Sequence, residues 1–342
     1  MTPQLKPLSQ QTIVVTGASS GIGLVTARMA AKQGAKVVLA ARNEDALRQL
    51  EQEINSAGGQ ATYVVADVGN EEDHRKILDA AIQKFGGVDT WVNNAGASIY
   101  GRIEQVPTDD AKRLFNTNFW GVFYGSKMAL EHLKTRGPGA IINVGSTVSD
   151  RSIPLQGIYS ASKFAVRSFT DALRMEIEEA GYPISVTLIK PAAIDTPYVE
   201  HAKNYMDEDP SFPPPVYAPQ TVANGILHAA THPVRDLFIG AAGKIFSAME
   251  KYAPRMTDRY MERAMFRQQK AGTRGRRSGI GLHRPGVGLQ ERGGYEGHVM
   301  ESSLYTKASS HPLMTGLLLG AAGAAVAAAL TAAPQVRERF RE

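Results

Sequence analysis

The loop that decides the fold of this chain is Thr16-Gly17-Ala18-Ser19-Ser20-Gly21-Ile22-Gly23. A β-branched run over residues 12–16 precedes it and predicts a buried strand. Helical spacing of apolar residues follows over 24–33, stops at Gly34, and leads to a second strand-like run over 35–40. Strand, glycine turn, helix and strand together predict a right-handed crossover, the context in which such a loop binds a dinucleotide.

The glycine loop suits an anion for physical reasons. Glycines let the backbone approach a pyrophosphate closely, and the N–H groups and dipole at the start of a helix attract its charge. The spacing here is Gly-x-x-x-Gly-x-Gly. The alternative is a tight turn without a ligand, and the flanking strands and helix argue against it.

A second set of residues suits acid–base chemistry. Residues 139–144 predict another buried strand, and Ser146 lies just past its carboxyl end, where open parallel sheets bind ligands. Tyr159 and Lys163 lie four apart on a predicted helix that runs to about Ala180, so they share one helix face. A phenol has a pKa of about 10, and a neighbouring opposite charge shifts it by about 1–3 units. Alone, Tyr-x-x-x-Lys is typical of surface packing; Ser146 and the glycine loop favour catalysis.

With these motifs the chain resembles a short-chain dehydrogenase/reductase of the compact single-domain branch, over about residues 11–240. The resemblance implies a Rossmann-like α/β fold, a doubly wound parallel sheet of about seven strands with helices on both faces. It also implies which residues bind the cofactor. Besides Tyr159 and Lys163 these are Thr16, Gly17, Ser19, Ser20, Gly21, Ile22, Gly23, Asp67, Asn94, Ala95, Gly96, Pro191, Ile194 and Thr196.

For catalysis the resemblance implies reversible hydride transfer between a nicotinamide and a carbonyl carbon. Tyr159 is expected to protonate the oxygen, while Ser146 orients the carbonyl. Lys163 is expected to bind the ribose hydroxyls and to lower the pKa of Tyr159, and Asn118 to link Lys163 to solvent through a water. One departure is Ala192, which replaces the usual glycine after the proline of the family's Pro-Gly-x-x-x-Thr segment; we expect it to alter the loop only slightly.

The choice between NADP and NAD depends on the end of the second strand. An NAD site commonly has an acidic residue there, but residues 39–43 contain no carboxylate, and Ala41 occupies the expected position. Arg42 follows and suits a 2′-phosphate, although Ser20 replaces a second basic residue that NADP users often have. The sequence therefore predicts NADP (NADPH). The alternative is that Arg42 is a solvated residue at a helix start.

The composition excludes several classes of site. The chain has 342 residues, 43% of them hydrophobic, which suits one large domain with an extension. It contains no cysteine, so disulfides, thiolate metal sites and thiol catalysis are excluded. His228 and His232 are four apart without a visible third ligand, so no metal site is predicted. Residues 1–11 lack an apolar run, and we expect a cytoplasmic catalytic domain.

The irregular stretch over 198–219 is expected to cover the substrate. It contains the run Phe212-Pro213-Pro214-Pro215-Val216-Tyr217, and its aromatic residues predict an apolar or bulky substrate. The alternative is a stiff surface loop.

The last hundred residues differ in composition from the rest. Residues 241–270 predict a basic amphipathic helix with a stripe of Lys251, Arg255, Arg259, Arg263 and Arg267. Residues 271–312 are rich in glycine and arginine and predict a linker. Residues 313–333 carry no charge, and as a helix of about 31 Å they match a bilayer core of about 30 Å. A charged tail follows over 334–342.

Three interpretations of residues 313–333 remain open. In the first, they anchor the protein in a membrane, and the basic stripe lies on anionic headgroups at the inner face of that membrane. In the second, they form a soluble helix buried against a partner subunit. In the third, they form a flexible tail. Nucleic acid is not an expected partner, because the linker has only Tyr295 to stack bases.

The sequence thus predicts an NADP-dependent oxidoreductase that interconverts a carbonyl and an alcohol on an apolar or bulky small molecule. The resemblance also implies a homodimer or homotetramer that packs through helices near 110–136 and 159–180. Two rivals are a cofactor-sensing module without turnover and a membrane-associated scaffold. The presence of Tyr159, Lys163, Ser146 and Asn118 favours an enzyme.

Overall fold

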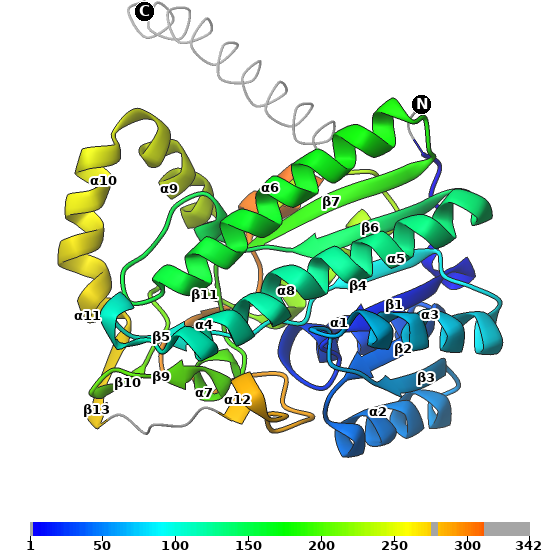
Figure 1. The fold of residues 1–342 in the computed structure, drawn as a ribbon, viewed down its shortest axis with the longest axis horizontal. Coiled ribbons are helices and arrows are strands. Elements are labelled where there is room, and N and C mark those ends of the chain that lie inside the picture. The colour runs from blue at the N-terminus through cyan, green and yellow to red at the C-terminus, as the bar shows by residue number, and fades with distance from the viewer. Residues whose placement is uncertain (1–2, 275–279, 311–342) are drawn as a thin grey trace, which may run out of the picture.

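A seven-stranded parallel sheet forms the centre of the molecule (Figure 1). The structure is a computed structural model that describes residues 3–274 and 280–310. The strand order is β12-β7-β6-β4-β1-β2-β3, and every pairing is parallel. This confirms the predicted Rossmann-like sheet. Its strands are β1 (Thr12–Thr16), β2 (Lys36–Ala41), β3 (Gln60–Val65), β4 (Thr90–Asn93), β6 (Gly139–Val144), β7 (Ile184–Pro191) and β12 (Asp236–Ile239).

Helices cover both faces of this sheet, which is why its strands are apolar on both sides. On β1, Ile13 and Val15 pack into one core cluster and Val14 into the other, as the alternation of a strand requires. The first face carries α1 (Gly21–Lys32), α2 (Glu44–Ser56) and α8 (Pro219–Ala229). The second carries α3 (Glu71–Phe85), α5 (Gly121–Arg136) and α6 (Gly157–Glu179).

The connections beyond the strands' carboxyl ends contain shorter elements. One follows β4 and leads into α5 through α4 (Thr108–Phe115) and a π-helical turn, η3 (Asn116–Trp120). The others are η1 (Leu8–Gln10), β5 (Ile99–Tyr100), η2 (Ile103–Gln105), η4 (Thr147–Ser149), β8 (Ala193–Ile194), α7 (Tyr198–His201), β9 (Lys203–Asn204), β10 (Glu208–Pro210) and β11 (Val216–Tyr217).

The predicted single helix over 241–270 is wrong. The chain forms α9 (Ala241–Tyr252) and α10 (Pro254–Tyr260), and then a π-helical turn, η5 (Met261–Met265), and α11 (Phe266–Gln268). The break is at Ala253, with φ −144° and ψ 56°. Pro254 causes it, because a proline lacks the N–H of a helix interior and disfavours helical dihedrals in the residue before it.

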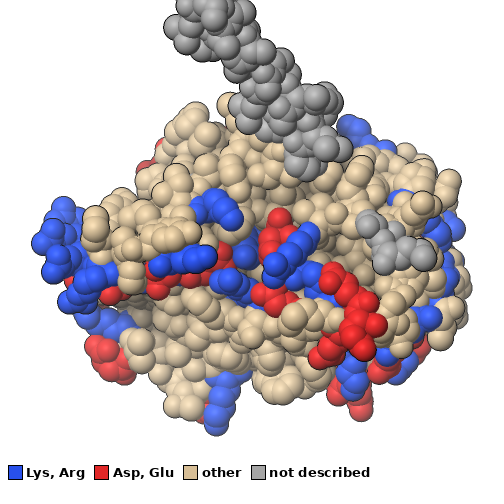
Figure 2. All heavy atoms as spheres, turned by 90° about the horizontal axis from the view of Figure 1, so that it is seen from above, with Lys and Arg blue, Asp and Glu red and all other residues tan. Residues whose placement is uncertain are grey.

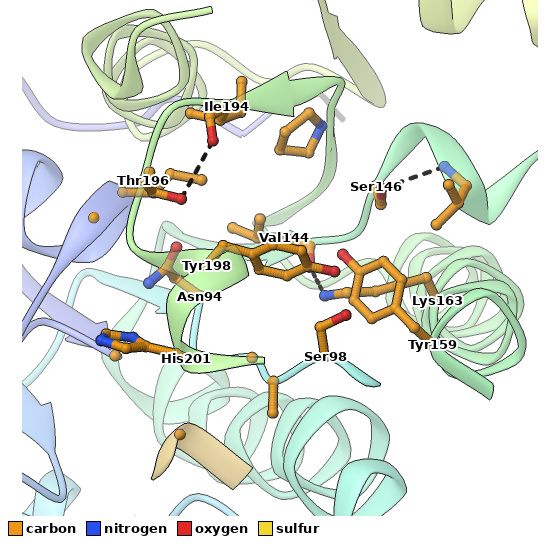
Figure 3. Close-up of a pocket in the computed structure, with 18 of the residues that line it drawn as sticks. Asn94, Ser98, Val144, Ser146, Tyr159, Lys163, Ile194, Thr196, Tyr198 and His201 are labelled. Carbon is orange, nitrogen blue, oxygen red and sulfur yellow. Dashed lines mark hydrogen bonds between the residues drawn. The ribbon is translucent and has the colours of Figure 1, made fainter. Parts of the chain in front are cut away.

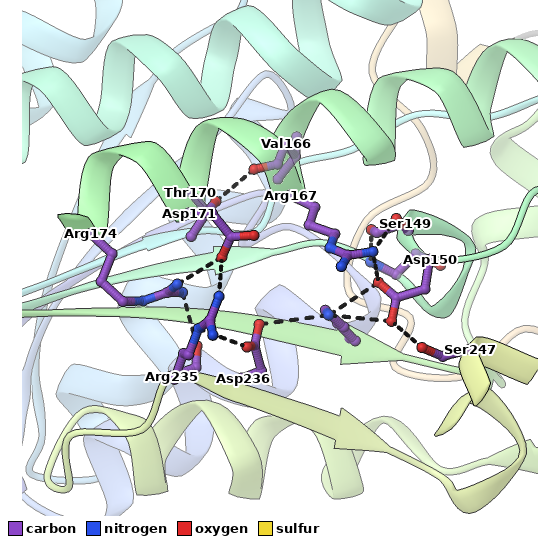
Figure 4. A network of polar contacts seen from close by, with 12 residues as sticks. Ser149, Asp150, Val166, Arg167, Thr170, Asp171, Arg174, Arg235, Asp236 and Ser247 are labelled. Carbon is purple, nitrogen blue, oxygen red and sulfur yellow. Dashed lines mark hydrogen bonds and ion pairs between the residues drawn. The ribbon is translucent and has the colours of Figure 1, made fainter. Parts of the chain in front are cut away.

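Charged side chains attach this helical region to the sheet domain. Ser247 of α9 donates a hydrogen bond of 2.8 Å to Asp150, which also pairs with Lys190 of β7 (Figure 4). Arg151 forms ion pairs with Glu250 and with Asp258. On the face shown in Figure 2, lysines and arginines gather at the end that α9 and α10 form in Figure 1.

The predicted linker over 271–312 is also wrong where the structure describes it. β13 (Lys270–Arg274) pairs antiparallel with β10, and β14 (Val299–Met300) adds to β11. Two helices, α12 (Ile280–His283) and α13 (Leu304–Ser310), complete the region, and α12 lies beside α7. The sheet domain supplies the backbone partners that the composition of this segment did not reveal.

Among residues 3–274 and 280–310, none of the helices is both long and apolar enough to cross a bilayer. The predicted apolar helix over 313–333 and the charged tail over 334–342 lie outside the described residues. The membrane interpretation therefore stays a prediction.

Candidate active site

A cavity of about 330 Å³ opens at the carboxyl ends of β1, β4, β6 and β7. This is the edge of an open α/β sheet where ligands bind. Of the predicted residues, Ser146, Tyr159 and Lys163 line it, together with Gly17, Ser19, Ser20, Gly21, Ile22, Arg42, Asp67, Asn94, Ala95, Gly96, Pro191, Ile194 and Thr196. Thr16, Gly23 and Asn118 do not line this cavity, but each is next in the chain to a residue that does.

The glycine loop is held by close contacts that only glycine permits. Gly17 has φ +69°, and a Cβ there would lie 2.8 Å from the Cα of Ala95. A Cβ on Gly23 would lie 2.1 Å from the carbonyl oxygen of Gly17. Thr16 Oγ1 accepts hydrogen bonds from the backbone N–H groups of Asn94 (3.0 Å) and Ala95 (3.1 Å). Thr16 and Gly23 therefore shape the loop from behind.

These features fit a dinucleotide. Ser20, the N-cap residue of α1, does not cap the helix with its side chain. Gly21 N–H donates to Gln290 O, so the N–H groups that follow it in the first turn are the ones left to face an anion. The same cavity extends from Arg42 and Asp67 on one side, past the glycine loop, to Tyr159 on the other.

Lys163 and Tyr159 are buried together on α6 (Figure 3). Lys163 Nζ donates a hydrogen bond of 2.8 Å to the carbonyl oxygen of Val144 and lies 5.8 Å from the centroid of the Tyr159 ring. The side chain is almost fully enclosed, and burial lowers the pKa of Lys163 to about 8. Desolvation disfavours the charged ammonium, which explains the direction of this shift.

The pKa of the Tyr159 hydroxyl differs from the prediction. Burial raises its pKa, and hydrogen bonds with Tyr198 and Ser146 oppose that effect without reversing it. The sequence predicted that Lys163 lowers this pKa. In the described structure desolvation is the largest effect on the phenol, because the side chain is buried in the cavity wall. The neutral phenol is therefore the favoured form near neutral pH.

Asn118 lies in the π-helical turn η3, a type of turn that is frequent at functional sites. Its amide is fully buried and bonded at both ends: Nδ2 donates to Ala97 O and Ser162 Oγ at 3.0 Å each, and Oδ1 accepts from Ala97 N at 2.8 Å. A Cβ on Gly96 would lie 3.6 Å from Asn118 Oδ1 and 3.9 Å from Lys163 Nζ. Asn118 thus borders the lysine from behind the cavity wall.

Sequence reasoning missed the polar partners of Tyr159. The Tyr198 hydroxyl points towards the Tyr159 hydroxyl in Figure 3, and it donates to Gln156 Oε1 at 3.1 Å. Ser98 Oγ donates to the same oxygen at 3.3 Å. The only signal in the sequence was the position of Tyr198, two residues after Thr196.

Beyond Tyr159 the cavity wall is largely apolar, although Arg151, Gln156 and Ser98 also line the cavity. Phe212 stacks on Tyr198 with a centroid distance of 6.1 Å, and Pro213 to Pro215 continue this wall. Phe246 of α9 and Met261 and Met265 of η5 line the same space. The C-terminal helices thus contribute to the candidate substrate chamber.

Arg42 and Asp67 have partners within the protein. Arg42 donates to the carbonyl oxygens of Gly281 (2.5 Å), Leu282 (3.2 Å) and Arg284 (3.1 Å). Because a guanidinium has five N–H donors, two remain for a ligand. Asp67 accepts a hydrogen bond of 2.5 Å from Arg113.

With this geometry established, the comparisons decide the family. The family model described as short chain dehydrogenase matches residues 11–206. The chain belongs to the short-chain dehydrogenase family. It is an oxidoreductase of that type, and it is 48% identical to the uncharacterized oxidoreductase YxnA of Bacillus subtilis over 92% of this chain and 90% of YxnA. It is also 37% identical to 3beta-hydroxysteroid dehydrogenase 1 of Eggerthella lenta over 59% of this chain and 77% of that protein.

Two solved structures share the fold. A short chain dehydrogenase/reductase from Burkholderia phymatum in complex with NAD has a TM-score of 0.66 and 25% identity, and covers 74% of this chain and 96% of its own. An alcohol dehydrogenase from Thermococcus sibiricus complexed with 5-hydroxy-NADP has a TM-score of 0.59 and 27% identity, and covers 67% of this chain and 95% of its own. The fold thus accommodates either nucleotide.

Proposed function

We propose that this oxidoreductase catalyses the reversible NADPH-dependent reduction of a carbonyl group on a bulky, apolar molecule. The observation that supports this most is the placement of Tyr159, Lys163 and Ser146 in one cavity with the glycine loop. A bound nicotinamide dinucleotide supplies the hydride.

Tyr159 is the proposed acid. Its raised pKa keeps the phenol protonated near neutral pH, so it has a proton to donate to a developing alkoxide. Ser146 hydrogen-bonds the same hydroxyl and orients the carbonyl oxygen beside it. A hydrogen bond with Tyr198 lowers the pKa of Tyr159, so Tyr198 is proposed to support the phenolate that forms. Its single O–H donates to Gln156 Oε1 in the described structure and is proposed to turn to Tyr159 during the reaction.

Lys163 is proposed to bind the ribose hydroxyls. Its Nζ uses one donor on Val144 O, and an ammonium has three, so two remain for the ribose. Asn118 borders this group across Gly96 and is proposed to lead protons from it through water. The arrangement favours turnover over mere cofactor sensing, since a sensor needs no acid.

NADPH is the proposed cofactor. β2 ends at Ala41, so no carboxylate there receives the hydroxyls of an NAD ribose or repels a 2′-phosphate. Arg42 follows, lines the cavity and keeps two N–H donors for a phosphate.

The proposed substrate is apolar because of the walls that enclose it. Phe212, Phe246, Met261 and Met265 present rings and thioether chains to the space beyond Tyr159. The relative from Eggerthella lenta is named for a 3beta-hydroxysteroid, an alcohol of this bulky apolar kind, and the proposal extends such a substrate class to this chain.

A homodimer or homotetramer is the proposed assembly. Trp120 is 41% exposed, and Phe164 and Met175 on α6 are 37% and 65% exposed. Exposed apolar groups at the end of η3, next to α5, and on α6 support packing between copies there. The mass measured by light scattering tests this, and Trp120→Glu is expected to shift it towards the monomer.

Turnover with a panel of carbonyls tests the proposed function. NADPH and NADH consumption is followed with small aldehydes, aromatic ketones and ring ketones of steroid size. We expect the highest kcat/KM with the largest apolar ketones and NADPH. A protein that turns over only small polar aldehydes contradicts the substrate class, and one that turns over none of the panel contradicts the proposed reaction.

A further inference from the structure

A C-terminal segment crosses the open side of the candidate cofactor cleft. We call residues 281–294 the strap. The strap lies against α4 and against the glycine loop, the end of β2 and the loop after β8, and the last three border the cavity. The match to YxnA covers 92% of this chain, a length that necessarily includes the strap.

The first part of the strap is held at the adenosine end. Arg42 donates to the carbonyl oxygens of Gly281, Leu282 and Arg284. Arg113 also donates to Leu282 O, at 3.2 Å. The Leu282 side chain is fully buried, so this end is fixed by packing as well as by hydrogen bonds.

The middle of the strap is bonded to the glycine loop itself. Leu289 N–H donates to Ser19 O, and Gly21 N–H donates to Gln290 O, each at 2.8 Å. Leu289 has φ +61°, a conformation that side chains larger than glycine seldom adopt. Its side chain packs on the hydrophobic core beside the loop, which compensates for that backbone.

The last part of the strap reaches the nicotinamide end. Glu291 accepts hydrogen bonds from Arg28 (2.7 Å) and Gln220 (2.8 Å). Gly293 N–H donates to Asp195 Oδ1 at 3.0 Å, and a Cβ on Gly293 would lie 2.2 Å from the carbonyl oxygen of Thr196. The strap thus runs from Arg42 at the end of β2, past the glycine loop, to Asp195 in the loop after β8.

The strap is also part of the wall of the cavity. Gly281, Pro285 and Gly286 line the same hollow as Gly17 and Tyr159. A molecule that fills this hollow therefore lies between the strap on one side and the carboxyl ends of the strands on the other.

We propose that the strap belongs to the cofactor site and retains the bound dinucleotide, so that release requires its contacts with the glycine loop and with Asp195 to open. The inference rests on the proposed cofactor binding. Four of the five glycines in the strap follow from the same geometry, because a Cβ on Gly281, Gly286, Gly288 or Gly293 would lie within 2.7 Å of a neighbouring atom. At Gly288, for example, a Cβ would lie 2.3 Å from the Cβ of Ala46.

The test is the rate of NADPH release. Protein loaded with NADPH is mixed with excess NADP⁺, and the loss of bound-NADPH fluorescence gives the dissociation rate. Gly293→Ala forces a methyl group against Thr196 O, and Glu291→Ala removes the contacts with Arg28 and Gln220. Glu296→Ala changes an exposed side chain just beyond the strap and is the control. Thermal unfolding confirms that each variant is folded.

We expect release at least tenfold faster in Gly293→Ala and Glu291→Ala, and within twofold of wild type in Glu296→Ala. Release rates within twofold of wild type in all three folded variants overturn the inference. So does faster NADPH association with unchanged release, which would make the strap an obstacle and not a retainer. A wild-type protein that binds neither NADPH nor NADH overturns the proposed function as well, so the two failures are distinguishable.

Discussion

Replacing Lys163 with methionine is expected to stabilise the protein at neutral pH while abolishing turnover. The folded protein holds the pKa of Lys163 at about 8, against 10.5 for the free side chain, because burial disfavours the ammonium. At about 1.4 kcal/mol per pKa unit, holding the charged lysine costs the folded state about 3 kcal/mol at pH 7. Methionine removes that cost but loses the hydrogen bond to Val144 O, worth about 1 kcal/mol.

The sign of the pH dependence follows from the direction of the shift. Between about pH 8 and 10.5 the unfolded chain binds the lysine proton and the folded protein does not, so wild-type stability rises with pH in this window. The advantage of Lys163→Met, about 2 kcal/mol at pH 7, should therefore shrink by about 2 kcal/mol by pH 9.5. Urea unfolding of both proteins at the two pH values measures this difference.

The control is Lys32→Met, which removes a positive charge from an exposed side chain. A difference between wild type and Lys163→Met that is the same at pH 7 and pH 9.5 would refute the reasoning. A Lys163→Met protein that keeps wild-type turnover would refute the proposed role of the lysine.

Four further predictions concern the cofactor and the acid. Gly23→Ala places a methyl group 2.1 Å from the carbonyl oxygen of Gly17, so we expect NADPH affinity measured by fluorescence titration to fall at least tenfold; unchanged affinity would contradict the loop geometry. Ala41→Asp places a carboxylate at the end of β2 and should shift the NADPH-to-NADH ratio of kcat/KM towards NADH; an unchanged ratio contradicts the proposed basis of cofactor choice. Tyr198→Phe removes one hydrogen bond from Tyr159 and should lower kcat about two- to tenfold in the NADPH assay, whereas no effect would remove Tyr198 from the site. Because the pKa of Tyr159 is raised, carbonyl reduction should be flat near neutral pH and fall only in alkaline buffer, while alcohol oxidation rises over the same range; a reduction rate that already falls below pH 7 contradicts the phenol as acid.

The sequence could predict the sheet and most of the cavity because their signals are local. The glycine loop, its strand and its helix are adjacent in the chain, and Tyr159 and Lys163 lie one helical turn apart. The helix break before Pro254 also has a local cause, the proline itself. It was missed because the basic residues recur every four positions across the break, which is typical of one continuous helix.

The strap could not be predicted for a different reason. Its glycine and arginine content is typical of a linker, but its partners are far away in the sequence: Arg42 and Leu282 are 240 residues apart. Tyr198 and Gln156 were missed similarly, since a hydrogen bond between the starts of two helices, α7 and α6, leaves no periodic pattern. Their meeting depends on the folded arrangement of β7, α6 and the segments after them.

The central claim is that Tyr159 is the acid of an NADPH-dependent reductase. Removal of the Tyr159 hydroxyl tests it most directly. NADPH consumption, and NADPH binding followed by fluorescence, are measured for wild type and for Tyr159→Phe. The account predicts that kcat falls by about 10²–10⁴-fold, as loss of a general acid does, while the dissociation constant for NADPH stays within about threefold. A Tyr159→Phe protein that keeps its kcat within tenfold of wild type would contradict the account.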